Sequence, residues 1–496
     1  MVGNGKKESV VFASSMDAKS IAQSIVGRFR DSPVIKDMKT ADRYFDGHNE
    51  AIEGKKRVYY DRNEKPHDNP AASNAKINSN FLRVLVQQKQ DYALAKTFVL
   101  KVLDEKGQEM KLDDSEYGTA WKNFCETALF KTCYAMAGNA VNRGAAWLYV
   151  WIDEDGDFRI QEVPATSVFP IWADRAHKEL DRLVYNYTAE RYESQEPTVK
   201  EYAEYWSDNE RILFNVSDNW KEMGEGENAR AHMTDGEEAV SWERVPFVCL
   251  KATDDEKPLL NFVKEQIDSY DALNSRSVDG LIDDLDPLLV MKGVSSQFVD
   301  IQEARELVKM TRTISLDADG DAHFIQAQTQ IQAHTEKMEA LRRDIVKFGY
   351  GVDFEDARFS GNPNQLVIKS LYQNLDTYTD GLERHFQDFI DDLKYFFDKW
   401  WELTEKGTLE ECEKYKVLVK FDRSAMMNRN EQIDSIVKLA GLEISQRTLL
   451  EENPVVQDVE LEMERLRQER EKKESENPLF GFPKKEEEKK DEGGEE

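Results

Sequence analysis

Large apolar residues recur at helical spacing over one long stretch of the chain. Between residues 364 and 405 they follow one another every three or four positions, from Val367 to Leu403. Because an α-helix repeats every 3.6 residues, this spacing places them on a single face. The pattern predicts one helix of about ten turns whose apolar face is buried.

Other segments show the same period. They cover Ile21–Phe29, Phe81–Tyr92, Ser115–Ala137, Pro258–Asp286 and 331–348. Short helices are also expected at 430–440, 445–452 and 455–473. Asn78 or Ser79 is suited to cap the helix Phe81–Tyr92. Pro287 is expected to end the helix before it, since proline lacks an N–H group. At Gly349-Tyr350-Gly351 a glycine is expected to supply the left-handed cap of helix 331–348.

The period changes to two between residues 147 and 251. Trp147–Ile152 and Phe158–Val163 flank the turn Asp153-Glu-Asp-Gly-Asp157, which predicts a β-hairpin. Further strands are expected at Arg182–Thr188, Lys200–Trp206, Arg211–Val216, Val245–Lys251 and Tyr415–Phe421. A small unit at 288–328 is predicted to contain a strand at Leu288–Gly293, a helix at Ile301–Thr311 and strands at Thr313–Leu316 and Phe324–Gln328. The fold class is therefore α+β.

Composition limits the possible functions. The chain has 496 residues, which suggests two to four domains, and its 67 Lys and Arg against 97 Asp and Glu give a net charge of −30. That excess argues against a protein that coats DNA, whose affinity comes from basic groups. Four cysteines without a C-x-x-C pair argue against a zinc ribbon and indicate a reducing compartment. The start of the chain lacks the apolar core of a secretory signal, and no apolar run is long enough to span a bilayer.

Motifs of catalysis are missing from the sequence. There is no P-loop and no H-E-x-x-H, and we expect no cofactor, no metal and no enzymatic activity. The two D-x-D-x-D runs, at Asp153–Asp157 and Asp317–Asp321, lack the glycine and glutamate that an EF-hand requires, so both are interpreted as turns. The segment Lys264–Asp286 holds seven acids against two bases. It is either a solvated helix face or an acidic wall that faces another polyanion.

Several segments resemble the portal proteins of tailed bacteriophages, in the branch typified by long-tailed phages of Gram-positive hosts. The order and spacing of the segments carry the resemblance, which extends from about residue 40 to 470. They are Arg43–Gly47, Asn74–Asn80, Val245–Lys251, Ile267–Ala272, Val290–Gly293, Gly349–Phe354, Phe359–Asn364, Leu366–Leu375, Asn430–Ile433 and Thr448–Pro454.

The resemblance implies a subunit built of named parts. These are an N-terminal leader (1–39), a wing (40–257), a stem helix (258–286), a clip (287–330), a second stem helix (331–348), a tunnel loop (349–363), a long wing helix (364–405), a crown (406–475) and a disordered acidic tail (476–496). It further implies a ring, usually of twelve subunits, at one capsid vertex of the virion, assembled in the host cytoplasm and without a membrane. Double-stranded DNA would pass through the ring during packaging and ejection. Expected partners are terminase, a head-completion or adaptor protein, scaffolding protein and major capsid protein.

Three sets of residues follow as candidate sites. The tunnel loop would place Asp353, Glu355, Asp356 and Arg358, with Gly361 and Asn362, at the narrowest point. An acidic stem would present Asp279, Asp283, Asp284 and Asp286 to the passing DNA. In the clip, the strand Thr313, Ile314, Ser315 and Leu316 would extend a neighbouring subunit's sheet. Two alternatives stay open: a metal-dependent nucleic-acid enzyme that uses one of the acid clusters, and a cytosolic helical scaffold unrelated to phage.

Overall fold

The computed structural model is a mixed α+β structure of two units. It describes residues 16–69, 72–103, 109–110, 115–192, 197–224, 230–235, 238–283, 288–294, 316–325, 331–356, 365–421, 438, 444–451, 453, 456 and 459–476. One unit comprises residues 1–359 and 370–422, and the other comprises 360–369 and 423–496. Among the described residues, none of the helices is both long and apolar enough to cross a bilayer.

The long helix α10 (Gln365–Leu403) confirms the strongest periodic pattern of the sequence. Its apolar face is buried at Leu382, Phe386, Phe389, Leu393 and Phe397, among others, within the larger hydrophobic core of the first unit. The ring of Phe397 lies 4.7 Å from that of Trp121 and 5.5 Å from that of Phe158, both edge to face. Aromatic pairs favour this geometry, so the core has a defined packing.

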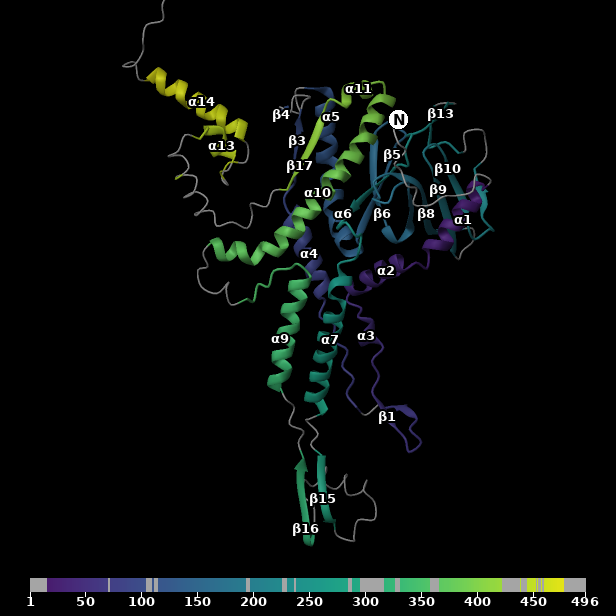
Figure 1. Cartoon of the computed structure of the whole chain (residues 1–496), viewed down its shortest axis with the longest axis vertical. Coiled ribbons are helices and arrows are strands. Elements are labelled where there is room, and N and C mark those ends of the chain that lie inside the picture. Colours follow the sequence, from purple (N-terminus) through teal and green to yellow (C-terminus); the bar gives the residue numbers. More distant parts are fainter. Residues whose placement is uncertain are drawn as a thin grey trace, which may run out of the picture. The chain divides into compact units, whose positions relative to one another are not determined.

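Helices α4 (Phe81–Leu94), α5 and α6 contribute buried residues to the same core and lie beside α10 in Figure 1. Helix α5 (Glu116–Phe124) begins after Ser115, whose hydroxyl accepts the Gly118 N–H, and the predicted start is confirmed. A π-helical turn, Cys125–Leu129, continues it into α6 (Phe130–Arg143), six residues beyond the predicted end. Gly144 then takes φ +90°, and a Cβ there would lie 2.2 Å from the carbonyl oxygen of Glu256.

The cap predicted for helix α4 (Phe81–Leu94) is wrong. The residue before the helix is Asn80, in the left-handed region with φ +51°, and its side chain makes no capping hydrogen bond. Asn78 and Ser79 form hydrogen bonds with other parts of the chain. The Asn78 amide donates to the Gly47 carbonyl oxygen at 2.7 Å, and the Ser79 N–H donates to Asp271. Tertiary contacts thus decide how this helix starts.

The hairpin predicted at residues 147–163 is confirmed. Strands β5 (Ala145–Ile152) and β6 (Phe158–Val163) pair antiparallel, and β14 (Phe247–Lys251) pairs with the other edge of β5. In the turn, one carboxylate oxygen of Asp153 accepts the N–H groups of Asp155 and Asp157 at 3.1 and 2.9 Å. This first D-x-D-x-D run is therefore a turn, as expected.

A second core lies under a five-stranded antiparallel sheet. The strand order is β11-β10-β9-β8-β7, and the bounds are β7 Val168–Trp172, β8 Leu180–Arg191, β9 Thr198–Trp206, β10 Arg211–Asn215 and β11 Lys221–Met223. Strands β8, β9 and β10 were predicted, whereas β7 and β11 were not. Helices α1 (Ala18–Phe29) and α2 (Pro33–Phe45) bury Ile21, Ile25, Ile35 and Met38 in this second core.

Smaller sheets complete the first unit, and one of them joins distant parts of the chain. Strand β17 (Lys416–Lys420) follows the short α11 (Leu409–Cys412), confirms the predicted run at 415–421 and pairs with β3 (Val99–Leu103). Strand β3 also pairs with β4 (Glu109–Met110), and β12 (Met233–Asp235) pairs with β13 (Glu238–Val240). The β3–β17 pairing links segments more than 300 positions apart, and local patterns do not reveal it.

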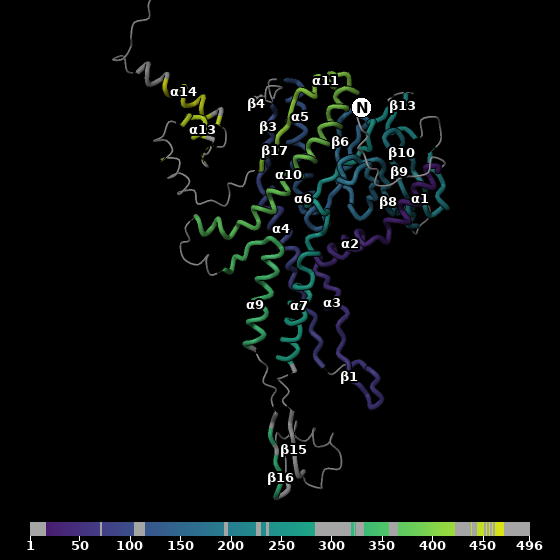
Figure 2. The backbone as a smooth tube through the Cα atoms, viewed as in Figure 1, coloured from purple at the N-terminus to yellow at the C-terminus, as the bar shows by residue number. Residues whose placement is uncertain are grey.

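Helices α7 (Leu260–Asp283) and α9 (Ile331–Phe348) lie side by side, as Figures 1 and 2 show. Both confirm predicted helices. The cap of α9 differs from expectation. Tyr350 holds the left-handed conformation, with φ +52°, whereas Gly349 and Gly351 do not. The Gly351 N–H donates to the Val346 carbonyl oxygen at 2.8 Å and closes the helix end.

The segment before α4 contains structure that the sequence patterns did not indicate. Helix α3 (Glu50–Glu53) is followed by β1 (Val58–Tyr60) and β2 (Pro66–Asp68), which form a two-stranded antiparallel hairpin.

In the unit predicted at 288–328, strand β15 (Leu288–Val294) confirms the first strand. It pairs with one strand, β16 (Leu316–Ile325), which replaces the two expected at 313–316 and 324–328. The second D-x-D-x-D run, Asp317–Asp321, lies within the bounds of β16 and does not separate two strands. Of this run only Asp321 has a partner in β15, opposite Lys292, and the register shifts between that pair and Leu316 opposite Val294. The predicted helix 301–311 lies outside the described residues.

In the second unit, α13 (Gln446–Glu451) and α14 (Val459–Glu476) confirm the helices expected at 445–452 and 455–473. The guanidinium of Arg470 donates to the Gln446 side-chain oxygen at 2.6 Å and joins the two helices. Of the helix predicted at 430–440, only residue 438 is described, and the predicted tail from 477 onward lies outside the described residues.

Candidate functional site: the helix pair α7 and α9

Three side chains form a polar row along one face of α7. Asp271, Ser275 and Asp279 are spaced four residues apart, and each is at most 1% exposed. They accept the backbone N–H groups of Ser79, Ile77 and Ala75, at 3.1, 3.1 and 2.7 Å respectively. We call this set of contacts the α7 ladder.

The α7 ladder depends on a match between two backbone geometries. Four residues of helix rise about 6 Å. Two residues of extended chain span about 6.6 Å. Every second N–H of the segment 75–79 therefore meets every fourth side chain of α7, with the two chains running in opposite directions. The ladder satisfies backbone donors that no sheet partner satisfies here.

The carboxylate of Asp279 also binds a lysine. The Lys55 ammonium lies 2.6 Å from Asp279 Oδ2, and the exposed fractions of the two side chains are 16% and 2%. Arg57 lies at 4.0 Å from the same oxygen. Asp279 thus holds both the outgoing and the returning chain of the hairpin β1–β2 against α7.

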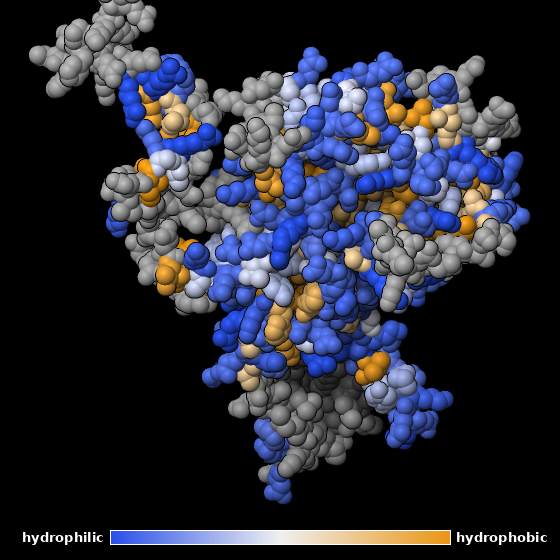
Figure 3. All heavy atoms as spheres, turned by 45° about the horizontal axis from the view of Figure 1, so that its top comes forward, coloured by the Kyte–Doolittle hydropathy of each residue, from blue (hydrophilic) through white to orange (hydrophobic). Residues whose placement is uncertain are grey.

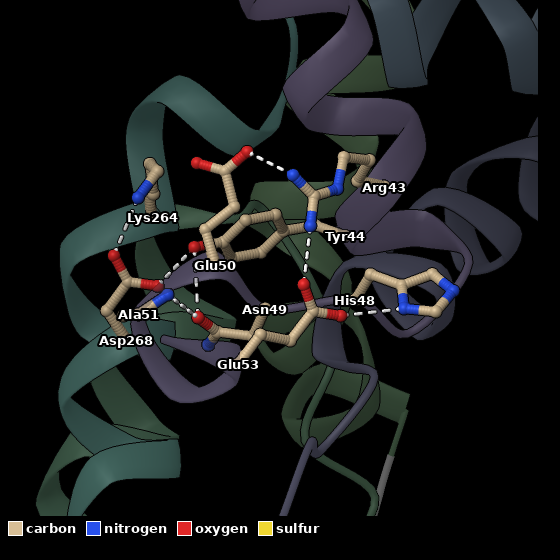
Figure 4. Close-up of polar contacts among 9 residues, drawn as sticks. All are labelled: Arg43, Tyr44, His48, Asn49, Glu50, Ala51, Glu53, Lys264 and Asp268. Carbon is tan, nitrogen blue, oxygen red and sulfur yellow. Dashed lines mark hydrogen bonds and ion pairs between the residues drawn. The ribbon is translucent and has the colours of Figure 1, made fainter. Parts of the chain in front are cut away.

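The upper end of the row is a hydrogen-bonded group around Tyr44 and Asp268 (Figure 4). The Tyr44 hydroxyl lies 2.6 Å from Asp268 Oδ1 and 3.1 Å from Asn49 Oδ1. Lys264 donates to Asp268 Oδ2 at 2.7 Å. Burial and the bond to Asp268 raise the pKa of Tyr44 to about 12, so the hydroxyl stays protonated. The Asn49 amide reaches Asp271 at 2.8 Å and links this group to the α7 ladder.

A second set of charges in Figure 4 closes the turn after α2. Arg43 binds Glu50 at 2.9 Å and Glu53 at 2.5 Å, and His48 lies 2.8 Å from the other oxygen of Glu53. The bond to His48, together with the charge of Arg43, lowers the pKa of Glu53. These side chains are exposed, so the group stabilises the turn only modestly.

Lys89 connects the C-terminus of α9 to α4. It is fully buried, and its ammonium donates to the carbonyl oxygens of Gly349 and, at 3.3 Å, Leu85. The Tyr378 ring of α10 lies 5.1 Å away. Burial lowers the pKa of Lys89 to about 7. A cation at a helix C-terminus meets the negative end of the helix dipole, which offsets part of the desolvation cost.

The start of the predicted tunnel loop is anchored. Val352 is 3% exposed, and the Gln88 side chain forms two hydrogen bonds with its backbone. Gln88 Nε2 donates to the Val352 carbonyl oxygen at 3.0 Å, and Gln88 Oε1 accepts the Val352 N–H at 3.1 Å. At Gly349 and Gly351 an added Cβ would lie 2.6 and 2.5 Å from Leu85. Both glycines are thus required for close contact with α4 and not for a left-handed backbone.

The described loop residues face an arginine of α9. Arg342 donates to Asp353 at 2.9 Å and also binds Glu355, whose side chain is 78% exposed. Asp353 and Glu355 are brought together by this contact, and Asp356 closes the turn through its N–H to the Asp353 carbonyl oxygen. Arg358, Gly361 and Asn362 lie outside the described residues.

The acidic stem differs from expectation at Asp279. This carboxylate is buried and is not presented to solvent. It neutralises the charge of Lys55 and accepts the backbone N–H of Ala75. The side chain of Asp283 and residues Asp284 and Asp286 lie outside the described part. In the predicted clip interface, Leu316 begins β16, while Thr313, Ile314 and Ser315 are not described.

A cleft of about 680 Å³ lies between β14 and α10. Lys251, Arg244, Asp388 and Asp392 line it, and Lys251 is paired with Glu256 at 2.9 Å. Within the described ranges, no group of three or more His, Cys, Asp or Glu side chains has the arrangement of a metal site.

Sequence reasoning missed the α7 ladder. Its α7 members belong to an acidic run that was interpreted by charge alone. The available signal was the four-residue spacing of Asp271, Ser275 and Asp279. Nothing in the pattern of 75–79 indicated that its N–H groups lacked a sheet partner.

Comparison with known proteins covers both units. The family model for the phage portal protein, SPP1 Gp6-like, matches residues 33–476. The portal protein of Bacillus phage SPP1 is 24% identical over 459 residues, which cover 91% of this chain and 86% of that protein. The portal protein of Clostridium phage phiCD119 is 25% identical over 424 residues, covering 81% and 86% respectively. The chain therefore belongs to the SPP1 Gp6-like family of phage portal proteins.

Proposed function

We propose that this portal protein forms a closed ring of about twelve subunits at a single capsid vertex. Double-stranded DNA passes through the ring during packaging and ejection. The ring docks terminase during packaging and a head-completion or adaptor protein afterwards, and it contacts scaffolding and major capsid protein during assembly. The observation that carries this proposal is the family match over residues 33–476, which includes α7, α9, α10 and the strands β15 and β16.

Within the ring we assign α7 and α9 to the stem, β15 and β16 to the clip, the segment after α9 to the tunnel loop, and the β-rich region with α10 to the wing. Residues 406–475 form the crown. The pair α7 and α9 supports the stem assignment because the two helices pack against each other and the segment 75–79 braces α7, which together make a rigid rod. A rigid rod suits a channel wall that must hold its diameter under load.

The charge of the chain supports a conduit that does not retain DNA. At a net charge of −30 per subunit, counterion release on contact with phosphates is small. Asp353 and Glu355 share Arg342, so this part of the loop offers phosphates little free positive charge. We propose that the loop approaches the DNA closely without binding it tightly.

The mass of the purified full-length chain tests the proposal. A ring predicts a dominant species close to twelve times 57.4 kDa, and single particles with a central hole. Monomers or dimers at every concentration would contradict the ring. Metal-dependent DNA cleavage by the same preparation, lost on one Asp→Ala change, would favour an enzyme instead.

A further inference from the structure

The hairpin β1–β2 is exposed on all sides in the single chain. All six strand residues are exposed, including Val58 at 41%, Tyr59 at 52% and Tyr60 at 66%. Figures 1 and 2 show the hairpin projecting beyond α3. The visible surface is mostly hydrophilic with separate hydrophobic patches (Figure 3). Three consecutive large side chains, Val58, Tyr59 and Tyr60, are exposed together in the hairpin.

The hairpin is nevertheless well formed. The strands pair in register from Val58 opposite Asp68 to Tyr60 opposite Pro66. At the tip, Asp61 Oδ1 accepts the N–H groups of Asn63 and Lys65 at 2.8 and 3.0 Å. Two-stranded hairpins are at best marginally stable alone in water. This one gains its order from its base, where Lys55 and Ala75 are fixed to Asp279.

The α7 ladder fixes the position of the hairpin β1–β2 relative to the C-terminal end of α7. Three buried polar side chains of α7 hold a projecting hairpin at a defined height on the helix. At that same height, directly after Asp279, Leu281 and Ile282 of α7 are 55% and 50% exposed. One subunit thus carries both a projecting hairpin with exposed Val58, Tyr59 and Tyr60 and an exposed apolar patch on α7.

Charge favours another copy of the chain as the occupant. Lys55 at the base of the hairpin is already paired with Asp279 of its own subunit. The rest of the segment, residues 56–69, holds four Lys or Arg against three Asp or Glu, whereas the whole chain has a net charge of −30. A second copy of the chain is therefore more acidic than the hairpin, and complementary charge favours contact between them. In a ring, each subunit meets the next through two different patches at equal height. Resting on the ring proposed above, we propose that the hairpin of one subunit docks on the Leu281–Ile282 end of α7 in the adjacent subunit.

A photo-crosslinking experiment tests this contact. The photoreactive amino acid p-benzoylphenylalanine replaces Tyr60 in the full-length chain, and equal amounts of ¹⁴N- and ¹⁵N-labelled protein are assembled together and irradiated. We expect crosslinked peptides of mixed label that join position 60 to the peptide containing Leu281 and Ile282. Crosslinks confined to one label, or crosslinks to any other part of a second copy, would overturn the assignment.

A substitution gives an independent readout. The double variant Tyr59→Ser/Tyr60→Ser should need about tenfold more protein for half-maximal assembly, since interface tyrosines often dominate binding. The matched control is Tyr192→Ser, which removes an aromatic ring that is 72% exposed and lies beyond the end of β8. If the double variant reached half-maximal assembly at the same protein concentration as Tyr192→Ser, the proposal would also be overturned.

The two proposals fail in different ways. Rings that form without the crosslink leave the portal ring intact and remove only the hairpin contact. A wild-type chain that forms no ring contradicts the ring itself. In that case a mixed-label crosslink in a smaller oligomer still supports the hairpin contact, and its absence rejects it.

Discussion

Asp271 and Asp279 lie eight residues apart on α7, and their carboxylates accept backbone N–H groups from opposite ends of one extended segment, at Ser79 and Ala75. Both side chains are 1% exposed. Burial raises the pKa of Asp271, while its bonds to Ser79 and Asn49 favour the charged form. Acidic residues in this helix thus have a structural role that is independent of any passing polyanion.

Removal of the Asp279 carboxylate tests that role. We expect Asp279→Ala to lower the free energy of unfolding by about 3 kcal/mol, because Lys55 and the Ala75 N–H lose a buried partner. Asp279→Asn should cost less, since its amide oxygen still accepts a hydrogen bond. The measurement is urea unfolding, with the exposed Glu265→Ala on the same helix as control. Equal midpoints for Asp279→Ala and the control would show that the ladder contributes nothing.

Lys89 gives stability a predictable pH dependence. Its pKa is about 7 in the folded chain, against the ordinary lysine value of 10.5 that applies once the chain unfolds. The unfolded chain therefore binds more protons between these two values, and stability rises with pH through this window. The slope from this one group is at most about 1.4 kcal/mol per pH unit.

Lys89→Met should remove this pH-dependent component of the free energy of unfolding when unfolding is compared at pH 7 and pH 9. The exposed Lys131→Met serves as control, and an unchanged slope in Lys89→Met would reject the assignment.

Because α4 and the end of α9 are in close contact, an alanine substitution should change stability differently at Gly349 and at Gly280. Gly349→Ala places a Cβ 2.6 Å from Leu85 and 2.8 Å from the Ile345 carbonyl oxygen, and should destabilise the fold by about 2 kcal/mol. Gly280→Ala in α7 meets nothing within 4 Å and should be neutral or stabilise by up to about 1 kcal/mol. Thermal unfolding of both variants checks this. Two variants of equal stability would mean that α4 and α9 are not packed as described.

Arg342 should control the order of the loop after α9. Arg342→Ala removes the partner of Asp353 and Glu355, and we expect faster hydrogen exchange in residues 353–356. Because the pairs are partly exposed, the free energy of unfolding should change by no more than about 1 kcal/mol. Arg343→Ala, on an exposed neighbouring position, is the control. Unaltered exchange in Arg342→Ala would show that other contacts hold the loop.

Much of the fold could be predicted because its signals are local. The apolar spacing from Val367 to Leu403 gave α10, and the Asp-Gly turn gave the hairpin β5–β6. The pairing of β3 with β17 could not be predicted, since its contacts join distant segments. One strand β16 was interpreted as two because its N-terminal half, Asp317–Asp321, resembles a turn in composition, and the register with β15 does shift within this run.

The candidate site was less predictable, for a physical reason. Charge in a sequence does not distinguish an acid that faces water from one that accepts backbone N–H groups, and Asp279 is of the second kind. Nor does composition show which residue takes a strained conformation: Tyr350 is left-handed, and its flanking glycines serve contact with Leu85. Both features are set by neighbours far away in the sequence.

An electron cryo-microscopy map of the assembled full-length chain tests the central claim most directly. We predict a closed ring with α7 and α9 around a central channel wide enough for a DNA duplex. A map without a closed ring, or with a channel too narrow for a duplex in every observed state, would contradict it.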